Sequence, residues 1–272
     1  MVKSTQPLLQ PDEPPPFIRL APVEGKEGDR LLIVCDHAAN QVPRQLEALG
    51  LPQTELDRHI GWDIGAGALT RELARQFGAA ALLSGYSRLV IDCNRQPGEA
   101  ASIPTVSDGT PVPGNADLDP AGCQTRREAL FDPYHAAIEA ELDAYARHGV
   151  APAILSIHSF TPRLLAGPAS DRPWQVGVLW DRDPRLPVPL MAALAARGLV
   201  VGDNQPYSAR DPDGYTLRVH AEARGLSHAL LEIRQDEIET AEGVARLAAH
   251  LVAALRPILA DPALYRPAHF VR

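Results

Sequence analysis

Cysteine is scarce in this chain of 272 residues: there are three, and none forms a CxxC pair. An odd number without motif spacing argues against a disulfide framework and favours a reducing, cytoplasmic environment. No apolar run approaches the roughly 20 residues needed to span a bilayer, so we expect no membrane association. The net charge of −8 gives no basic footprint for nucleic acid.

Familiar catalytic motifs are missing as well. No GxSxG elbow, P-loop or GxGxxG follows an apolar run, which argues against serine hydrolases, nucleotide hydrolases and dinucleotide-dependent enzymes. Hydrophobic residues still make up 45% of the chain, enough to bury a sizeable core. We predict a Pro-rich N-terminal arm at residues 1–28, without the apolar core of a signal peptide, and one domain at residues 29–272.

Short apolar runs alternate with stretches of helical periodicity from residue 29 onward. This alternation predicts a single α/β domain whose mixed, mostly parallel sheet is flanked by helices. We expect strands at residues 30–36, 153–158, 175–180, 199–202 and 229–233, and a strand pair or one interrupted strand at residues 79–83 and 88–92. We expect helices at residues 55–77, 125–148, 189–197 and 240–259. Residues 96–120 are dense in Pro, Gly, Asp and Asn, which predicts a long loop of the kind that often forms a lid.

Three apolar runs deliver residues that bind metals or move protons. His37 follows LLIVCD, His158 follows AILSI, and Glu232 lies in ALLEIR. Open α/β sheets place their active sites at the carboxyl ends of strands. Two imidazoles and a carboxylate from distant segments therefore predict a mononuclear metal centre with a general base beside it. A single histidine at such a position would more often be a hydrogen-bonded residue of the core. The prediction rests on two histidines that follow apolar runs in the same way.

The third metal ligand has two candidates. Asn40 lies three residues after His37, where an HxxE zinc motif places its carboxylate, but an amide is a weak zinc ligand. Asp63 lies in HIGWDIGAG, on a predicted helix with a Gly- and Ala-rich surface where other backbone can pack closely. We favour Asp63, because zinc centres commonly combine histidines with a carboxylate. The remaining alternatives are a weak Asn40 ligand, or a site with a different metal or none.

A second group of polar residues follows in YSRLVIDCNRQPG. Arg88 and Asp92 share one face of the predicted strand, which is costly unless they are paired or used. Asn94 and Arg95 come next, and an arginine there can bind a carboxylate or polarise a carbonyl oxygen. An Arg88–Asp92 ion pair that only orders the following loop is the competing interpretation.

The segment around Glu232 offers further candidates. A carboxylate flanked by apolar residues is either desolvated, with a raised pKa suited to a general base, or held by a cation such as Arg234. The preceding residues include four that could line a substrate site, with ordinary loop packing as the alternative: Tyr207, Tyr215, Arg218 and His220.

Six ordered motifs, CDHAAN, GWDIGA, SRLVIDCNR, SIHSFTP, VGDNQPYS and LLEIRQD, resemble the N-formylglutamate amidohydrolase family over nearly all of residues 30–260. The resemblance implies a fold like that of the zinc carboxypeptidases, with the metal at the strand ends. It implies that His37 and His158 are zinc ligands, that Asn94 and Arg95 bind or polarise the substrate, and that Glu232 is the base. One departure is Asn40, where carboxypeptidases have a Glu ligand.

Together these features predict a cytoplasmic, zinc-dependent amidohydrolase that cleaves a small anionic N-acyl amino acid, typified by N-formyl-L-glutamate. The alternatives are a carboxypeptidase-like or other deacylase, and a catalytically silent binding protein of the same fold. The sequence leaves the oligomeric state open. The expected metal ligands are His37, Asp63 and His158, the catalytic residues Glu232 and Arg95, and the substrate-binding residues Arg88, Asn94, Tyr207 and Tyr215.

Overall fold

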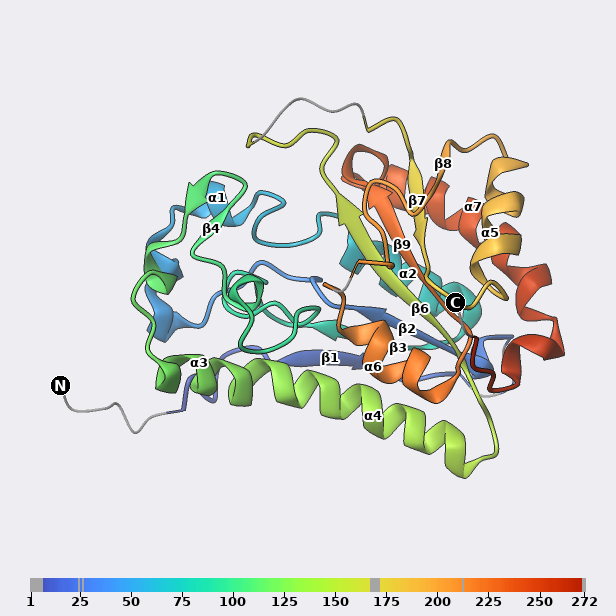
Figure 1. Cartoon of the computed structure of the whole chain (residues 1–272), viewed down its shortest axis with the longest axis horizontal. Coiled ribbons are helices and arrows are strands. Elements are labelled where there is room, and N and C mark those ends of the chain that lie inside the picture. The colour runs from blue at the N-terminus through green and yellow to red at the C-terminus, as the bar shows by residue number, and fades with distance from the viewer. Residues whose placement is uncertain (1–6, 24, 26, 167–171, 212, 271–272) are drawn as a thin grey trace.

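The computed structural model of the chain describes residues 7–23, 25, 27–166, 172–211 and 213–270. A seven-stranded sheet crosses the molecule in the order β1-β3-β2-β6-β9-β7-β8 (Figure 1). Its strands are β1 Phe17–Leu20, β2 Leu31–Cys35, β3 Ala80–Ser84, β6 Ala153–Phe160, β7 Val176–Leu179, β8 Val201–Asp203 and β9 His228–Arg234. The neighbours β3, β2, β6 and β9 are parallel, whereas β1 and β7 run antiparallel to β3 and β9. The predicted mixed, mostly parallel sheet is confirmed.

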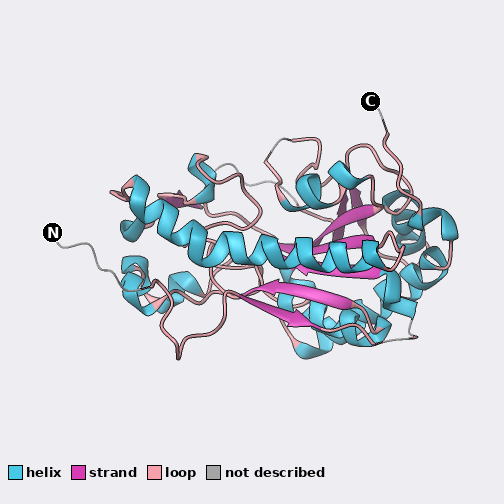
Figure 2. Cartoon of the chain, turned by 90° about the horizontal axis from the view of Figure 1, so that it is seen from below, coloured by secondary structure: helices cyan, strands magenta, loops and turns pink. Residues whose placement is uncertain are grey.

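Helices cover both faces of this sheet. One face packs against α2, α5 and α7, and the other packs against α4, which lies along the near side of the sheet in Figure 2. The long helices are α2 Ala66–Phe77, α4 Asp132–Arg147, α5 Pro187–Ala195 and α7 Ala241–Leu259. The short ones are α1 Gln53–Leu56, α3 Pro120–Arg126 and α6 Thr216–His220. A π-helical turn at Arg127–Phe131 joins α3 to α4.

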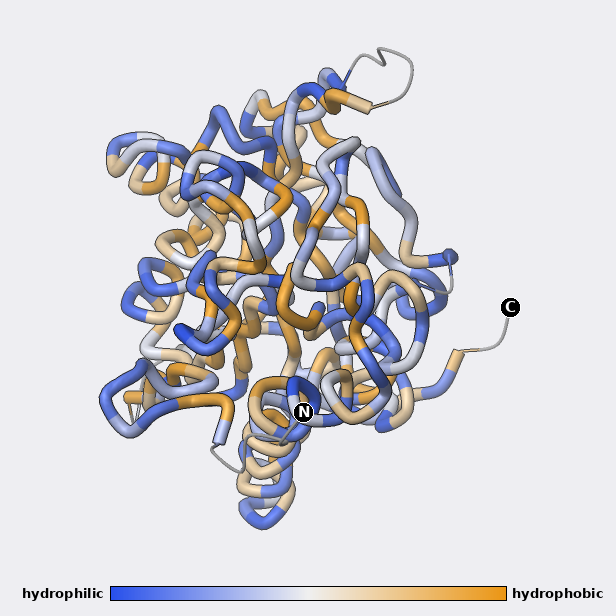
Figure 3. Tube along the Cα trace, turned by 90° about the vertical axis from the view of Figure 1, so that its left-hand side faces the viewer, coloured by the Kyte–Doolittle hydropathy of each residue, from blue (hydrophilic) through white to orange (hydrophobic). Residues whose placement is uncertain are grey.

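The hydrophobic core follows from the period of the strands. In β2, Leu31 and Ile33 face α2, while Leu32 and Val34 face α4, and all four are fully buried. A strand covered on both faces reads as a continuous apolar run, which is why LLIVC shows no polar alternation. In the coloured part of the trace in Figure 3, many hydrophobic residues lie toward the interior and many hydrophilic ones at the margins.

The N-terminal arm contributes a strand to the sheet. β1 lies within the predicted arm and pairs with β3 along its length. The Tyr86 hydroxyl donates to the backbone oxygen of Pro14 at 2.7 Å, which fastens the preceding segment. Part of the predicted arm, residues 1–6, 24 and 26, lies outside the described residues. Among the residues that are described, no helix is long and apolar enough to cross a membrane.

Two sequence-based predictions of secondary structure are wrong. Residues 88–90 form a turn and residues 91–92 belong to no regular element, with the Val90 N–H donating to the Ser87 oxygen at 3.0 Å. The helix predicted at residues 55–77 is interrupted, because α1 ends at Leu56 and α2 begins at Ala66. Gly65 explains the interruption, since it precedes α2 with a left-handed φ of 79°. The loop at residues 96–120 holds a small hairpin of β4 Val106–Ser107 and β5 Thr110–Pro111.

The backbone at Gly65 has no room for a side chain. A Cβ built there would lie 2.3 Å from the backbone oxygen of Ile238, whereas a Cβ at Gly149, with a similar φ of 70°, would meet nothing within 4 Å. We expect Gly149→Ala to lower the free energy of unfolding by about 1–2 kcal/mol through backbone strain alone. Gly65→Ala should lower the free energy of unfolding by about 1–3 kcal/mol more than Gly149→Ala does, through overpacking. Urea denaturation of the two variants measures the difference, and equal losses would contradict it.

Candidate functional site

The residues of the site come together at the carboxyl ends of three neighbouring strands. His37 lies two residues beyond the end of β2, His158 lies near the end of β6, and Glu232 lies on β9. His158 and Glu232 are direct partners in the parallel pairing of β6 with β9. The apolar runs therefore deliver these side chains to one edge of the sheet, as their sequence positions predict.

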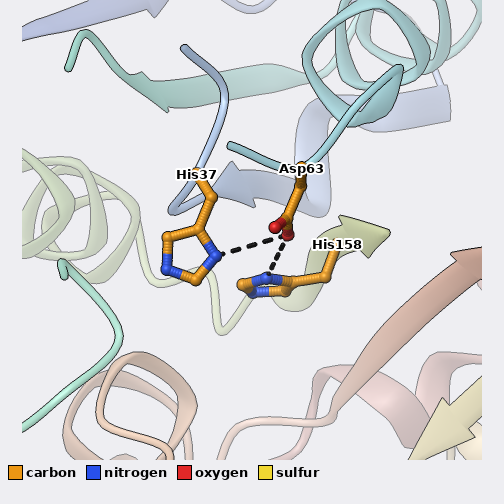
Figure 4. Close-up of side chains that lie close together, drawn as sticks. All are labelled: His37, Asp63 and His158. Atoms are coloured by element: carbon orange, nitrogen blue, oxygen red, sulfur yellow. Dashed lines mark hydrogen bonds and ion pairs between the residues drawn. The ribbon is translucent and has the colours of Figure 1, made fainter. Parts of the chain in front are cut away.

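Two imidazoles converge on one carboxylate in this region (Figure 4). Nδ1 of His37 lies 3.3 Å from Oδ2 of Asp63, and Nδ1 of His158 lies 2.9 Å from the same oxygen. The three side chains are buried, and one ligand atom from each lies within 4.8 Å of the other two. Two histidine nitrogens and a carboxylate oxygen form the ligand set of many catalytic zinc sites, so this group could hold a metal ion.

The opposite nitrogen of each ring binds a second carboxylate. Nε2 of His37 lies 2.7 Å from Oδ1 of Asp92, and Nε2 of His158 lies 3.0 Å from Oδ2 of Asp36. Carboxylate partners of this kind fix the orientation and tautomer of metal-binding histidines and raise their basicity. Sequence analysis did not find these partners. Asp36 stands directly before His37 at the end of a buried strand, and that position is the signal that could have identified it.

Asp63 occupies a turn, not the helix predicted from the sequence. It precedes α2, and its N–H donates to the His37 oxygen at 3.0 Å. The N–H of Ser159 donates to Asp63 Oδ2 at 3.2 Å, which fixes the carboxylate from the β6 side. The other candidate ligand, Asn40, lies apart from this group and donates to Asp57 Oδ1 at 2.8 Å. The geometry thus brings Asp63, and not Asn40, to the two histidines.

The electrostatics of the cluster favour a cation. Asp36, Asp63 and Asp92 are all buried, and Arg88 donates to Asp92 Oδ2 at 2.7 Å and 3.0 Å and lies 3.4 Å from Asp63 Oδ1. Burial alone would lower the pKa of His158, but its hydrogen bonds to Asp36 and Asp63 outweigh burial and raise that pKa to about 10. Three buried carboxylates, only two of which contact Arg88, hold positive charge strongly, whether from protons or from a metal ion.

The Arg88–Asp92 ion pair expected from the sequence is present, although it spans a turn and not a strand face. A buried carboxylate next to an arginine stays ionised: burial opposes this, but Arg88 and His37 hold the pKa of Asp92 well below its usual range. Arg88 also approaches Asp63 Oδ1 at 3.4 Å. The pair therefore belongs to the site and does more than order the following loop.

Glu232 is desolvated and incompletely hydrogen-bonded. Its side chain is buried, and Oε2 has no hydrogen-bond partner among the described residues. Burial raises its pKa to about 7, with the charge of Asp63 acting in the same direction and that of His158 opposing it. The alternative cation, Arg234, binds Asp236 and Glu237 instead. Of the two states considered for Glu232, the structure shows the desolvated one.

A cavity of about 280 Å³ opens over these residues. His37, Asp63, His158 and Glu232 line it. Five of the other residues singled out in the sequence line it as well: Arg88, Asn94, Arg95, Tyr207 and Arg218. The sequence analysis missed several further lining residues, among them His59, Phe160, Trp180 and Asp211. His59 lies between α1 and α2, Phe160 is the last residue of β6, Trp180 follows β7 and Asp211 lies after β8, and no metal-binding pattern marked these positions as cavity lining.

Tyr215 and His220 do not line the cavity. The Tyr215 ring packs against Phe131 and His135, at centroid distances of 5.1 Å and 4.8 Å. His220 stacks on His135 at 5.2 Å. Tyr215 still reaches the site through its backbone, because its N–H donates to Asn94 Oδ1 at 2.9 Å. Its contribution in this structure is to hold Asn94 in place.

Comparison with known proteins agrees with this architecture. The family described as N-formylglutamate amidohydrolase matches residues 29–239. The crystal structure of gene product Atu2144 from Agrobacterium tumefaciens is 32% identical, with a TM-score of 0.86 over 93% of this chain and 98% of that one. N-formylglutamate amidohydrolase from Ralstonia eutropha JMP134 is 25% identical, with a TM-score of 0.66 over 89% and 97%. Among curated proteins, none matches the chain.

Fold and site thus define an α/β protein of the hydrolase class, with buried histidines and carboxylates at the ends of parallel strands. The family match covers well over half of the chain. The chain belongs to the N-formylglutamate amidohydrolase family.

Proposed function

We propose that the chain is a metal-dependent amidohydrolase that cleaves the amide bond of a small N-acyl amino acid, typified by N-formyl-L-glutamate. The observation that carries this proposal is Glu232, a buried carboxylate with an unpaired oxygen, on the strand next to His158 and facing the same cavity as the His37–Asp63–His158 group. Membership of the amidohydrolase family supports the reaction class.

The residues present fit a zinc ion. His37 and His158 would bind it through Nδ1, because their Nε2 atoms are engaged with Asp92 and Asp36, and Asp63 would supply the third ligand. Three protein ligands with an open fourth position are typical of catalytic zinc. When bound, such an ion lowers the pKa of a water molecule to about 7 and polarises a carbonyl oxygen.

Glu232 is the proton carrier in this proposal. With a pKa near 7, its carboxylate can accept a proton from the attacking water and pass it to the leaving amine nitrogen. A group whose pKa lies close to the working pH performs both transfers efficiently. Its buried position keeps bulk water from competing for that proton.

Two arginines are available for the two negative charges that remain, those of the substrate carboxylate and of the oxyanion. The side chain of Arg88 is fixed by Asp92, so we assign it, with Asn94 and Tyr207, to binding the substrate carboxylate. Arg95 donates to the backbone oxygens of Asn94 and Asp213 and forms no ion pair with a carboxylate among the described residues. Its charge is therefore available to stabilise the oxyanion that develops on the carbonyl, an interaction worth about 2.7–4 kcal/mol of barrier.

Metal content and a substrate panel test the proposal directly. Purified protein should carry about one zinc per chain and should release formate from N-formyl amino acids faster than it cleaves acetyl or peptidyl analogues. Preferential cleavage of peptidyl substrates would instead favour a carboxypeptidase-like activity. Absence of both zinc and hydrolysis after metal-supplemented expression would favour a catalytically silent binding protein.

Glu232→Gln should slow turnover strongly while leaving the metal in place, because it keeps the size of the side chain but not its basicity. We expect kcat to fall by roughly 10²- to 10⁴-fold, with unchanged zinc content. Glu242→Gln, at an exposed position in the first turn of α7, is the matched control and should behave as wild type. Near-normal turnover of Glu232→Gln would reject the base assignment.

Asp36→Asn and Asp92→Asn should weaken metal binding, since each replaces the carboxylate that orients a histidine. Zinc affinity, measured by competition with a chelator, should fall about 10- to 100-fold. Asp183→Asn is the control, because Asp183 is also buried but pairs with Arg185 away from the cavity. If the first two variants bind zinc like the control, the histidine nitrogens have been assigned wrongly.

A further inference from the structure

The cavity is longer than the reacting groups require. Along β9, His228, Leu230 and Glu232 all line it, because every second residue of a strand points to the same face. At about 3.3 Å per residue, Leu230 lies roughly 7 Å and His228 roughly 13 Å from Glu232 along the strand. The cavity therefore continues well past the proposed base, back along the sheet.

The walls of this extension are apolar. Leu230 pairs in register with Leu179 of β7, and both line the cavity. Their neighbours Leu231 and Val178 belong to the core on the opposite face of the sheet, under α5 and α7. Leu217 of α6 lines the cavity as well. We call the apolar wall that Leu179, Leu217 and Leu230 contribute to this cavity the leucine compartment.

The far end of the extension is unsuited to a second carboxylate. His228 and Glu222 line the cavity there, with Nε2 of His228 lying 3.7 Å from Oε1 of Glu222. Nδ1 of the same ring lies 2.8 Å from the backbone oxygen of Leu226, so Nδ1 carries a proton and donates it. The carboxylate of Glu222 repels an acidic side chain, and the leucines cannot hydrogen-bond to it.

The two arginines assigned to the reaction lie on other elements. Arg88 and Arg95 come from the segment between β3 and the loop of residues 96–120, whereas the leucine compartment is built by β7, β9 and α6. A third arginine that lines the cavity, Arg218, follows Leu217 on α6. The carboxylate recognition assigned to Arg88 and the apolar contact of Leu179 and Leu230 are thus supplied by different parts of the chain. A substrate that uses both parts has a carboxylate and an aliphatic group.

We propose that the leucine compartment binds an aliphatic group of the substrate, about the size of a norleucine side chain, and that this chain prefers N-acyl amino acids carrying such a group to N-formylglutamate. The inference rests on the proposed amidohydrolase function and specifies its substrate class. The aliphatic group belongs either to the side chain of the amino acid or to the acyl group.

The first test compares four substrates with the zinc-loaded wild-type protein: N-formylglycine, N-formylnorleucine, N-hexanoylglycine and N-formylglutamate. One of the two aliphatic substrates should exceed N-formylglycine in kcat/KM by about 10- to 200-fold. If N-formylnorleucine is the better substrate, the aliphatic group belongs to the amino-acid side chain. If N-hexanoylglycine is the better substrate, it belongs to the acyl group. Equal values for all four, or a preference for N-formylglutamate, would overturn the proposal.

Binding separates this inference from the proposed function. Affinities for the same four compounds, measured by calorimetry with Glu232→Gln, should rank the aliphatic ones first. That ranking together with no hydrolysis by the wild-type protein would reject the amidohydrolase proposal and support the leucine compartment. Hydrolysis of all four compounds without any ranking would reject the compartment and support the amidohydrolase proposal.

Two variants of α6 locate the effect. Leu217→Ala removes part of the compartment wall, whereas Val219→Ala changes a residue of the same helix that is 40% exposed and does not line the cavity. We expect Leu217→Ala to lower the ratio of kcat/KM for the preferred aliphatic substrate over N-formylglycine about tenfold. Val219→Ala should keep the ratio. Leu179→Ala tests the wall of the compartment on β7 independently, by the same ratio of kcat/KM values. An unchanged ratio in both leucine variants would contradict the inference.

Discussion

The structure of the site depends on keeping several carboxylates buried at one edge of the sheet. Oδ2 of Asp63 is approached by both histidine rings and by the Ser159 N–H. A buried charge of this kind is stable only when it is fully paired, and each pair here joins segments far apart in the sequence. Asp63 links the turn before α2 to the ends of β2 and β6. The same contacts that neutralise the carboxylate therefore define the geometry of the site.

The parallel sheet makes this concentration of charge possible. Because β2, β6 and β9 are adjacent and parallel, their carboxyl ends lie together, and His158 and Glu232 stand side by side in register. The remaining length of each strand is apolar and buried, so the fold is stabilised away from the site. A cluster that would destabilise an isolated hairpin is carried by a large core under α2 and α7.

Much of this arrangement could be predicted from the sequence. Each of three apolar runs predicts a buried strand, and His37, His158 and Glu232 mark where the reactive side chains of these strands lie. What could not be predicted depends on tertiary pairing. Residues 88–92 hold a short apolar run typical of a strand, with Arg88 and Asp92 at its ends. In the structure the segment turns instead, and Arg88 pairs with Asp92 in the site. The partnership of Asp36 with His158 joins residues 122 apart. No local pattern distinguishes such a contact from a solvated acid.

The chemistry and the shape of the cavity are coupled through α6. Thr216 donates through its hydroxyl to Asp36 Oδ1 at 2.9 Å, and the other oxygen of Asp36 binds Nε2 of His158. The next residue, Leu217, lines the cavity. A group bound against Leu217 therefore presses on the same short helix that orients a proposed metal ligand. Because Thr216 and Leu217 are adjacent on α6, a displacement of Leu217 would also displace the hydroxyl that holds Asp36.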